Sequence, residues 1–419
     1  MPTSARSTAQ FFHQIPNAET LIERIAQKQP GAFPPERIPL GDNHAESIRQ
    51  RLDFLKNKNI NLPRLTGRQP QTDFTALNGN IENFIGLTTV PTGVIGPLRV
   101  LGSAADGDFF VPLATSEGAL VASFDRGARA GRAAGGITSV CVSEAVQRSP
   151  VFRFQNLGEV GRFVAFVLSQ YDQFSTIVAR RSNHARLLDV KTTIEGNQLI
   201  LTFDYATGDA AGQNMVTLCT DAICRHLVGQ SPVPVLDWYI EGNYSGDKKA
   251  TALSFSSVRG KKVTAEVDLP GEVVTKILKT TPAAMAQYWR TSTVGVLQSG
   301  AIGAQGHVAN GLAALFLACG QDVACVAEAA VGLTRMEETP AGGLYVAVTL
   351  PNLIVGTVGG GTGLWTQREC LEMMDCYGAG RARKFAEICG AVALAGEISI
   401  AAALSAGHFA AAHEKLGRG

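Results

Sequence analysis

The amino-acid sequence predicts an α+β fold. The first reason is the order of patterns between residues 137 and 240, which predict strand, helix, hairpin, helix and strand. That order is the split βαβ, or ferredoxin-like, arrangement. The second reason is the alanine-rich stretch 385–413, which charged residues interrupt and which suits a helix packed inside protein better than a membrane span. A chain of 419 residues also exceeds one ordinary core, so we expect two or three domains.

The first eighty residues predict a small helical arm. Prolines interrupt its short amphipathic segments, and Asp42 or Asn43 can cap a helix. The apolar stripe of that helix comprises Ile48, Leu52 and Leu55. From residue 81 the chain is rich in glycine and β-branched residues, which indicates extended backbone that packs tightly.

Residues 111–132 carry the first candidate chemistry. Thr115 and Ser116 suit a helix N-cap, and Glu117 follows them in an apolar context. A carboxylic acid with few polar neighbours is disfavoured as an anion, so Glu117 could keep its proton near neutrality and act as a general acid. A capped helix whose glutamate meets an arginine is the simpler interpretation. The arginines that follow at helical spacing would form one cationic stripe able to bind a polyanion; they are Arg126, Arg129 and Arg132.

Six elements are predicted between residues 137 and 240. They are a strand at 138–146, a helix at 157–171, strands at 187–194 and 199–203 joined by a turn at 195–197, a helix at 211–227 and a strand at 233–239. The turn at 207–215 places small residues at a helix N-terminus, where free backbone amides favour a phosphate. An ordinary helix start would give the same pattern.

Two further stretches carry candidate polar groups. In the loop 241–250, Lys248 follows Asp247; a lysine there is usually solvated, but an ammonium held by a carboxylate can also stabilise an oxyanion. Asp322 lies in apolar surroundings, where a lone acid is costly unless it is paired. Around them we expect a strand at 263–267, a helix at 273–285 and a helix at 295–318 that carries His307 and Asn310. The glycines of 356–362 imply backbone pressed against a ligand or another chain.

Composition excludes several classes of protein. Hydrophobic residues make up 45% of the chain and the formal net charge is +1, so there is no bulk bias toward nucleic acid. The N-terminus lacks the hydrophobic core of a secretion signal, and we expect a cytoplasmic protein without a membrane span. The eight cysteines contain no CxxC pair, which predicts buried reduced thiols and neither a disulfide framework nor a metal site.

Taken together, the motifs resemble 3-hydroxy-3-methylglutaryl-CoA reductases, of the class related to the soluble catalytic part of the eukaryotic enzymes. The likeness runs from about residue 81 to residue 413. The matching motifs, in the family's order, are ENFIG at 82–86, PLATSEG at 112–118, GDAAGQNM at 208–215, GNYSGDKK at 242–249, GQD at 320–322, GTVGGGT at 356–362 and LAGEISIAAALSAGH at 394–408.

The resemblance implies a metal-free reductase of an acyl-CoA thioester. Lys248 would stabilise the carbonyl oxygen, and Glu117 would protonate it at the aldehyde stage. Asp322 would tune both groups electrostatically. His413 would protonate the departing thiolate from a mobile tail, although a terminal histidine is more often simply exposed.

The resemblance also implies binding residues. Coenzyme A would be held by Ser123, Arg126 and Arg129, and the acyl group by Arg148, Glu241, Asp247, Lys249, His307 and Asn310. NADPH, with NADH as the alternative, would be bound by Ser182, Asn183, Asp209, Gly212, Asn214, Met215 and Gly360. Asn183 and Ala206 replace basic residues that the family places there, and Arg180, Arg181 and Arg186 are near enough to supply that charge.

The acyl-group pocket departs from the family pattern. Glu241 stands where a serine is expected, and an expected lysine falls on Thr291 or Ser292, with Arg290 beside it. Like charges repel in a partly buried site. Either Glu241 therefore pairs with Arg148 or Lys249, or the substrate is not a dicarboxylic half-thioester. A family relative that reduces another acyl thioester, or a catalytically silent CoA-binding or nucleotide-binding protein, remains the alternative.

For the domains, the resemblance implies a large domain around a long central helix and an inserted nicotinamide-binding domain. The boundaries we expect are 1–80 for the arm, 81–148 with 251–419 for the large domain, 149–240 for the ferredoxin-like domain and 241–250 for an active-site loop. The protein would be a homodimer or homotetramer with its active site at the subunit interface.

Overall fold

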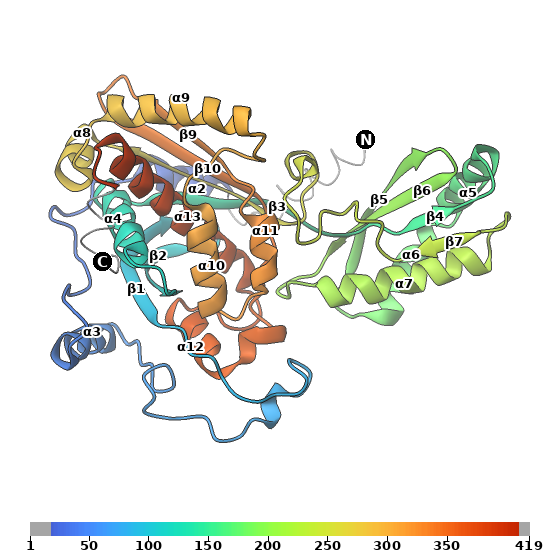
Figure 1. Cartoon of the computed structure of the whole chain (residues 1–419), viewed down its shortest axis with the longest axis horizontal. Helices are drawn as coiled ribbons and strands as arrows, with labels where there is room; N and C mark the ends of the chain where they lie inside the picture. The colour runs from blue at the N-terminus through green and yellow to red at the C-terminus, as the bar shows by residue number, and fades with distance from the viewer. Residues whose placement is uncertain (1–17, 410–419) are drawn as a thin grey trace.

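The computed structural model describes residues 18–409, which form a larger and a smaller lobe (Figure 1). The helices of the larger lobe are α2 (Ala18–Ala26), α3 (Ala45–Asn57), α4 (Leu120–Ala133), α8 (Gly271–Val273), α9 (Pro282–Ser299), α10 (Val308–Ala318), α11 (Val326–Ala329), α12 (Trp365–Met373) and α13 (Ala382–Ser405). Its strands are β1 (Thr92–Leu101), β2 (Asp106–Ala114), β8 (Gly260–Leu269), β9 (Leu333–Glu338) and β10 (Leu344–Leu353). Both α-helices and antiparallel strands are present, as expected.

The strand β3 (Ile137–Arg148) belongs to both lobes. Its first part pairs with β8, antiparallel, and its last three residues pair with β6 of the smaller lobe. Through β3 the sheet runs in the order β7-β4-β6-β3-β8-β10-β9, and Figure 1 shows β3 crossing from one lobe to the other. The smaller lobe is therefore tied to the larger one by continuous backbone pairing.

The smaller lobe contains the predicted hairpin, second helix and last strand, whereas the predicted first strand, 138–146, lies in β3 and pairs mostly with β8 of the larger lobe. The elements of the smaller lobe are β4 (Val151–Arg153), α5 (Leu157–Ser169), α6 (Tyr171–Arg181), β5 (Arg186–Glu195), β6 (Gln198–Ala206), α7 (Gln213–Gly229) and β7 (Asp237–Tyr239). All pairings are antiparallel, and the spatial order of the strands is β7-β4-β6-β5. The helix predicted at 157–171 ends earlier, at Ser169. After a single residue, Gln170, a second helix that was not predicted begins at Tyr171.

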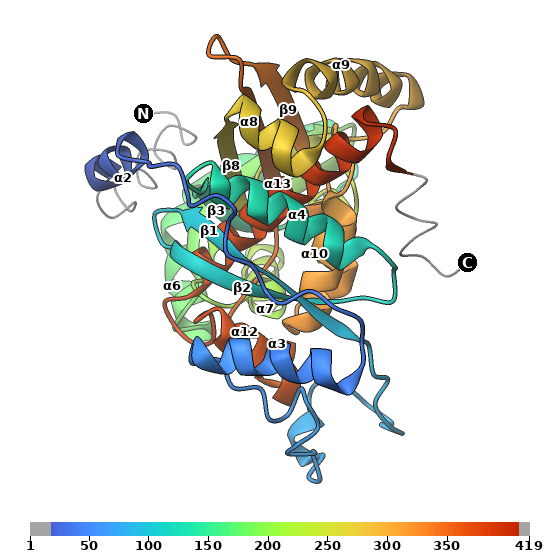
Figure 2. The same ribbon diagram turned by 90° about the vertical axis from the view of Figure 1, so that its left-hand side faces the viewer.

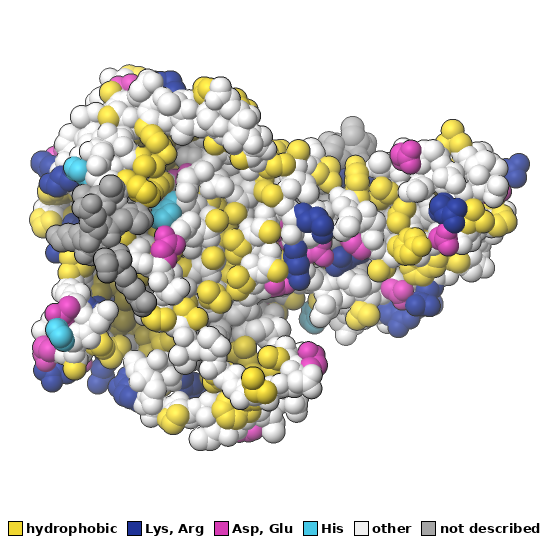
Figure 3. All heavy atoms as spheres, in the orientation of Figure 1, with side chains coloured by type: hydrophobic (Ala, Val, Ile, Leu, Met, Phe, Trp, Pro, Cys, Tyr) yellow, Lys and Arg dark blue, Asp and Glu magenta, His cyan; other side chains and the backbone are white. Residues whose placement is uncertain are grey.

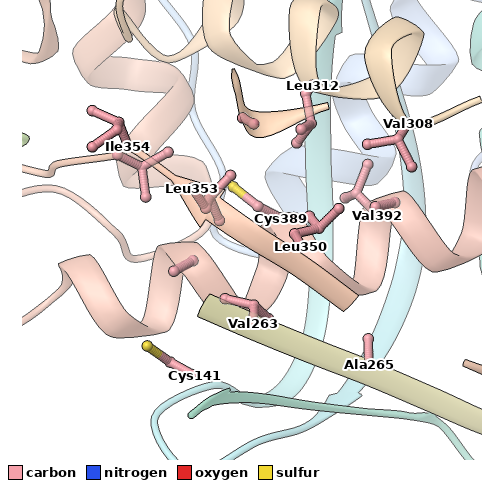
Figure 4. Close-up of a cluster of buried hydrophobic side chains, with 14 of the residues drawn as sticks. Cys141, Val263, Ala265, Val308, Leu312, Leu350, Leu353, Ile354, Cys389 and Val392 are labelled. Atoms are coloured by element: carbon pink, nitrogen blue, oxygen red, sulfur yellow. The ribbon is translucent and has the colours of Figure 1, made fainter. Parts of the chain in front are cut away.

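The helix α13 is the buried centre of the larger lobe. It is long and apolar enough to span a membrane, but 83% of its most apolar window is buried inside the protein, as expected for a core helix. Small residues let neighbours approach closely: a Cβ at Gly127 of α4 would overlap the Ala395 carbonyl of α13, and Figure 2 shows the two helices against each other. Figure 4 shows Cys389 and Val392 of α13 among side chains of β8, β10 and α10.

Several local predictions are wrong. The helix after Glu117 begins only at Leu120, with Ala119 in the left-handed region at φ 65° and no side-chain cap from Thr115 or Ser116. In α3, the N-cap is His44, and Asp42 instead accepts the amide N–H of that residue.

The two helices expected at 273–285 and 295–318 are also wrong. The first is broken, because a π-helical segment Val274–Leu278 ends at Lys279 (φ 61°) and α9 starts afresh at Pro282. The second is broken by Gly300 (φ 71°), which ends α9, so that α10 begins at Val308. All eight cysteines are buried and free, as predicted.

Candidate active site

Lys248 and Asp322 form an ion pair where the two lobes meet. The Lys248 Nζ atom lies 3.0 Å from Asp322 Oδ2, and each side chain is about two-fifths exposed. The hydrogen bond from Lys248 to Asp322 raises the pKa of the lysine. Desolvation raises the pKa of Asp322, but the bond and charge of Lys248 outweigh it and the net shift is downward. The ammonium group is therefore held in its charged form, and Figure 3 shows basic and acidic side chains gathered at this junction.

Local backbone geometry places Asp322 at this point. After α10 ends, Gly320 adopts φ 65° and packs against the Gly361 carbonyl, where a side chain would overlap. Asp322 then caps the short 3₁₀ helix Val323–Cys325 by accepting the Ala324 N–H at 3.0 Å. Gln213, at the start of α7, donates to the same carboxylate at 3.4 Å. The costly lone acid expected from the sequence is thus paired.

The loop that carries Lys248 rests on a buried network of ion pairs. Arg148 Nη1 lies 3.2 Å from Glu241 Oε2 and 3.0 Å from Asp247 Oδ2. Asp247 also pairs with Arg259 at 2.8 Å, and Arg259 pairs with Glu328. The first alternative for Glu241 is therefore confirmed, since the acid pairs with Arg148. The exposed Lys249 instead donates to the Asp247 carbonyl at 2.9 Å.

Sequence reasoning missed Arg259 and Glu328. Neither lies in a motif of the resemblance, and both are fully buried. For Glu328 a signal existed, because it is a lone acid in the apolar run VAEAA, which is the pattern that drew attention to Asp322. Arg259 offered no such signal in its serine-rich loop.

Glu117 lies in a second cluster. Its carboxylate accepts a hydrogen bond from Asn310 Nδ2 at 2.7 Å, and the side chain is exposed. The expectation of few polar neighbours, and the alternative of an arginine partner, are both wrong. His307, three residues before Asn310, is buried and stacks on Phe124 with 4.7 Å between the ring centroids. Burial lowers the pKa of His307 to about 4, so the ring is neutral at pH 7.

The two clusters lie at opposite ends of α10. Asn310 belongs to the first turn of this helix, and Asp322 follows its C-terminal end. The helix has 11 residues and is roughly 16 Å long at a rise of 1.5 Å per residue. Within residues 18–409, neither a hydrogen bond nor an ion pair joins Glu117 to Lys248 or Asp322. Among the described residues, the candidate catalytic groups of one chain therefore form two separate clusters, Glu117 in one and Lys248 with Asp322 in the other.

The arginines of α4 are only partly available to a ligand. Arg126 donates to the Ser399 hydroxyl at 3.0 Å and to its carbonyl at 2.7 Å, and Ser123 donates to the same hydroxyl. Arg132 pairs with Asp108 at 3.1 Å. The Nε atom of Arg129 is buried and has no hydrogen-bond partner among the described residues. Two of the three arginines thus also anchor α4 to its neighbours, and their contact with a polyanion stays a prediction.

The predicted nucleotide residues gather around the start of α7. Gly212 caps this helix with φ 83°, and Asn214 and Met215 lie in its first turn. Asp209 accepts the Gly380 and Ala382 amides at 2.7 and 3.0 Å, which fastens the turn to the N-terminus of α13.

The glycine-rich segment 356–362 packs against this turn. A Cβ at Gly356 would lie 2.5 Å from the Ala211 nitrogen, whereas Gly359 and Gly360 face open space. The prediction that this backbone presses on a ligand or another chain is therefore wrong for Gly356, which presses on its own chain.

Ser182 and Asn183 follow α6 close to the same turn. The Ser182 hydroxyl accepts the amides of His184 and Ala185, and Arg186 pairs in register with Ala206, the residue before 207–215. Arg180 and Arg181 are exposed in the last turn of α6. Three exposed basic residues thus flank Ser182 in the chain, on the last turn of α6 and at the start of β5.

The last features are the possible metal ligands and the histidines near the C-terminus. No group of three or more His, Cys, Asp or Glu side chains suited to a metal ion occurs within residues 18–409. His408 is exposed just after α13. His413 lies outside the described residues.

Comparisons with known proteins agree on one family. A family model described as hydroxymethylglutaryl-coenzyme A reductase matches residues 47–418. The 3-hydroxy-3-methylglutaryl-coenzyme A reductase of Pyrococcus abyssi is 40% identical over 410 residues, which cover 96% of this chain and all of the relative. That of Methanothermobacter thermautotrophicus is 41% identical over 371 residues, or 88% and 90% of the two chains.

A solved structure shares the fold. It is the class II 3-hydroxy-3-methylglutaryl-CoA reductase from Streptococcus pneumoniae bound to NADPH, with a TM-score of 0.69 and 18% identity. The match covers 85% of this chain and 96% of that one. At this identity the likeness concerns the fold alone.

Proposed function

Because the chain belongs to the hydroxymethylglutaryl-coenzyme A reductase family, we propose that it reduces 3-hydroxy-3-methylglutaryl-CoA to mevalonate with two equivalents of NADPH and releases coenzyme A. The observation that carries this function is the ion pair between Lys248 and Asp322. It fixes a charged ammonium group at the lobe junction, where such a group can stabilise a developing oxyanion.

The residues divide the chemistry between them. Lys248 stabilises the negative charge on the carbonyl oxygen as the thioester is reduced, and Asp322 keeps that ammonium charged and in place. The departing coenzyme A thiolate takes a proton from His413. Glu117 gives a proton to the oxygen at the aldehyde stage, with Asn310 orienting its carboxyl group.

The residues around α7 fit a nicotinamide dinucleotide. The helix start offers free amides, Gly359 and Gly360 leave open space, and Arg180, Arg181 and Arg186 bring positive charge toward Ser182. NADPH, when bound, supplies a hydride ion for each of the two reductions. The basic cluster suits the extra phosphate that distinguishes NADPH from NADH.

The domains follow from the same assignment. We take residues 149–240 as a ferredoxin-like nicotinamide domain, 81–148 with 251–419 as the large domain around α13, 1–80 as the arm and 241–250 as the active-site loop. In support, the strands β4, β5, β6 and β7 stand in the spatial order fourth, first, third, second, which is that of the split βαβ arrangement. The buried length of α13 supports its central role.

An oligomer would complete the active site. Glu117 and the pair of Lys248 with Asp322 stand at opposite ends of α10, so Glu117 of one chain would meet Lys248 of another across a homodimer or homotetramer interface. The segment 81–90 supports this arrangement, because it exposes apolar side chains that a second chain could cover; they are Ile81, Ile85, Leu87 and Val90. The enzyme would work in the cytoplasm.

One observation favours a related substrate as the second candidate. Arg148, expected to hold the distal carboxylate, is already paired with Glu241 and Asp247. A relative acting on an acyl thioester without that carboxylate would not need to displace them.

A turnover assay tests the proposal. Purified protein is expected to consume two NADPH for each mevalonate formed, and Lys248→Ala to abolish this turnover. Lys276→Ala, which changes an exposed lysine paired with Glu272, is the matched control and is expected to keep full activity. If NADPH is consumed only with another acyl-CoA, the second candidate replaces the first. If Lys248→Ala leaves turnover unchanged, the assigned chemistry is wrong.

A further inference from the structure

Glu328 and Arg259 form a fully buried ion pair directly beneath Lys248. Arg259 Nη1 contacts Glu328 Oε1, and both side chains have essentially no exposed surface. Glu328 comes from the short helix α11, whereas Arg259 immediately precedes β8. Two parts of the larger lobe therefore meet under the active-site loop.

Both members of this pair reach into the loop. Glu328 Oε1 accepts the backbone N–H of Lys248 at 3.1 Å. Arg259 Nη2 lies 2.8 Å from Asp247 Oδ1, at ion-pair distance but without hydrogen-bond geometry, so the pair contacts two consecutive residues of the loop. On the far side Asp247 is held by Arg148 as well.

The backbone of Lys248 needs such support. Its φ of 56° lies in the left-handed region, which disfavours residues other than glycine. A residue in that region persists only where its surroundings determine the conformation. The hydrogen bond to Glu328 fixes the direction of the Lys248 N–H and, with it, the direction in which the side chain leaves the backbone toward Asp322.

Stability alone explains this pair poorly. Taking two charges out of water is costly, and apolar replacements of similar volume are often equally stable or better. The second carboxylate oxygen of Glu328 and the Nε of Arg259 are buried and have no hydrogen-bond partner within the described residues. A charge pair that leaves polar atoms unsatisfied is better explained by the geometry that it imposes on the loop.

We propose that Glu328 and Arg259 are positioning residues that set the backbone of the active-site loop and thereby aim the Lys248 ammonium group at the reacting oxygen. This inference rests on the proposed function, in which Lys248 stabilises that oxygen. It gives a role in catalysis to α11, which lies outside all the motifs that carry the resemblance. Glu328 acts through Lys248 and touches neither substrate nor cofactor.

The test compares two variants of Glu328 in the full-length enzyme. Glu328→Gln keeps an oxygen that can accept the Lys248 N–H but loses the charge opposite Arg259, whereas Glu328→Ala loses both. A displacement near 1 Å at a catalytic group can lower turnover about 100-fold. We therefore expect kcat to fall about 30- to 100-fold in Glu328→Ala and only about three- to tenfold in Glu328→Gln. The KM values for NADPH and the acyl-CoA are expected to stay within about twofold, since no binding group is removed.

Controls separate positioning from general destabilisation. Glu337→Ala removes an exposed acid paired with Arg335 and is expected to leave kcat unchanged. The primary isotope effect on kcat with deuterated NADPH is expected to grow in Glu328→Ala, because the hydride step slows; loss of folded protein would not change it. If Glu328→Ala does not fold, Glu328→Gln decides, and an unchanged kcat in that variant overturns the inference.

The inference and the proposed function fail differently. If wild-type protein reduces no 3-hydroxy-3-methylglutaryl-CoA, the function is wrong. If the wild type is active but both Glu328 variants keep its kcat, or lose kcat and raise both KM values together, the positioning role is wrong while the function stands.

Discussion

Replacing Glu241 with serine is expected to lower the KM for 3-hydroxy-3-methylglutaryl-CoA. Glu241 stands 3.2 Å from Arg148, which is the arginine proposed to hold the distal carboxylate of the substrate. The negative charge of Glu241 competes with that carboxylate for the same guanidinium group. Serine removes the competing charge and offers a hydroxyl donor in its place.

The size of the effect follows from the geometry. Arg148 is 9% and Glu241 19% exposed, so the pair is weakly screened. Two unit charges about 3.2 Å apart attract by roughly 5 kcal/mol at an effective dielectric constant near 20, before desolvation is subtracted. The net contribution of a hydrogen bond to a charged group is about 1.5–3 kcal/mol. If the substrate carboxylate gains this contribution, its KM falls about 10- to 100-fold. Folding is expected to persist, because Asp247 still pairs with Arg148 at 3.0 Å.

Steady-state kinetics measure this effect. The KM for the acyl-CoA is compared between wild type and Glu241→Ser, together with the inhibition constant of free coenzyme A. Free coenzyme A carries no acyl carboxylate, so its inhibition constant is expected to be the same in both proteins. A KM that is unchanged or higher in the variant, with the coenzyme A constant unchanged, would show that Arg148 does not hold the substrate carboxylate.

Three further predictions concern pH and coenzyme A. The hydrogen bond to Asp322 raises the pKa of Lys248 above 10.5, so Lys248 is an ammonium ion at all lower pH values. Asp322→Asn is therefore expected to move the decrease of kcat at alkaline pH to lower pH. If this decrease occurs at the same pH in the variant, the pairing is contradicted. The pKa of His307 lies at about 4 in the folded protein and at 6.5 in the unfolded chain. The free energy of unfolding therefore suffers no loss from this residue above pH 6.5 and decreases as the pH falls toward 4. This loss is roughly 3 kcal/mol. Chemical denaturation above pH 6.5 and near pH 4 measures it as the free energy of unfolding of the wild type minus that of His307→Gln. If this difference is the same at both pH values, the histidine is not buried in its neutral form. Arg129→Ala is expected to raise the KM for the acyl-CoA about tenfold without changing kcat. Arg132→Ala is the control, because Arg132 already pairs with Asp108. Equal effects of the two substitutions on KM would refute the coenzyme A assignment.

The sequence predicted those parts that depend on local pattern. The hairpin of β5 and β6 follows from alternation around a glycine turn, and α13 follows from a run of small apolar residues with few charges. The sequence also predicts that Asp322 needs a partner, because a lone acid in apolar surroundings is costly, but it does not identify Lys248 as that partner. For the hairpin and for α13, neighbours in the chain determine the outcome, whereas the partner of Asp322 comes from a distant part of the chain.

What depends on tertiary contacts could not be predicted in the same way. Glu117 and Asn310 are 193 positions apart, and no local rule joins them. Arg259 and Glu328 become neighbours only when β8 and α11 pack together. The breaks at Lys279 and Gly300 lie within helical patterns, and left-handed backbone at each of them ends a helix that periodicity alone would continue.

Complementation between two inactive variants tests the central claim most directly. That claim is that Glu117 of one chain and Lys248 of another build a single reductase site, since the two groups lie at opposite ends of α10. Co-expressing equal amounts of Glu117→Ala and Lys248→Ala chains is expected to restore about one quarter of wild-type activity per chain, because about one site in four receives both intact groups. A mixed protein no more active than either variant alone would contradict the account.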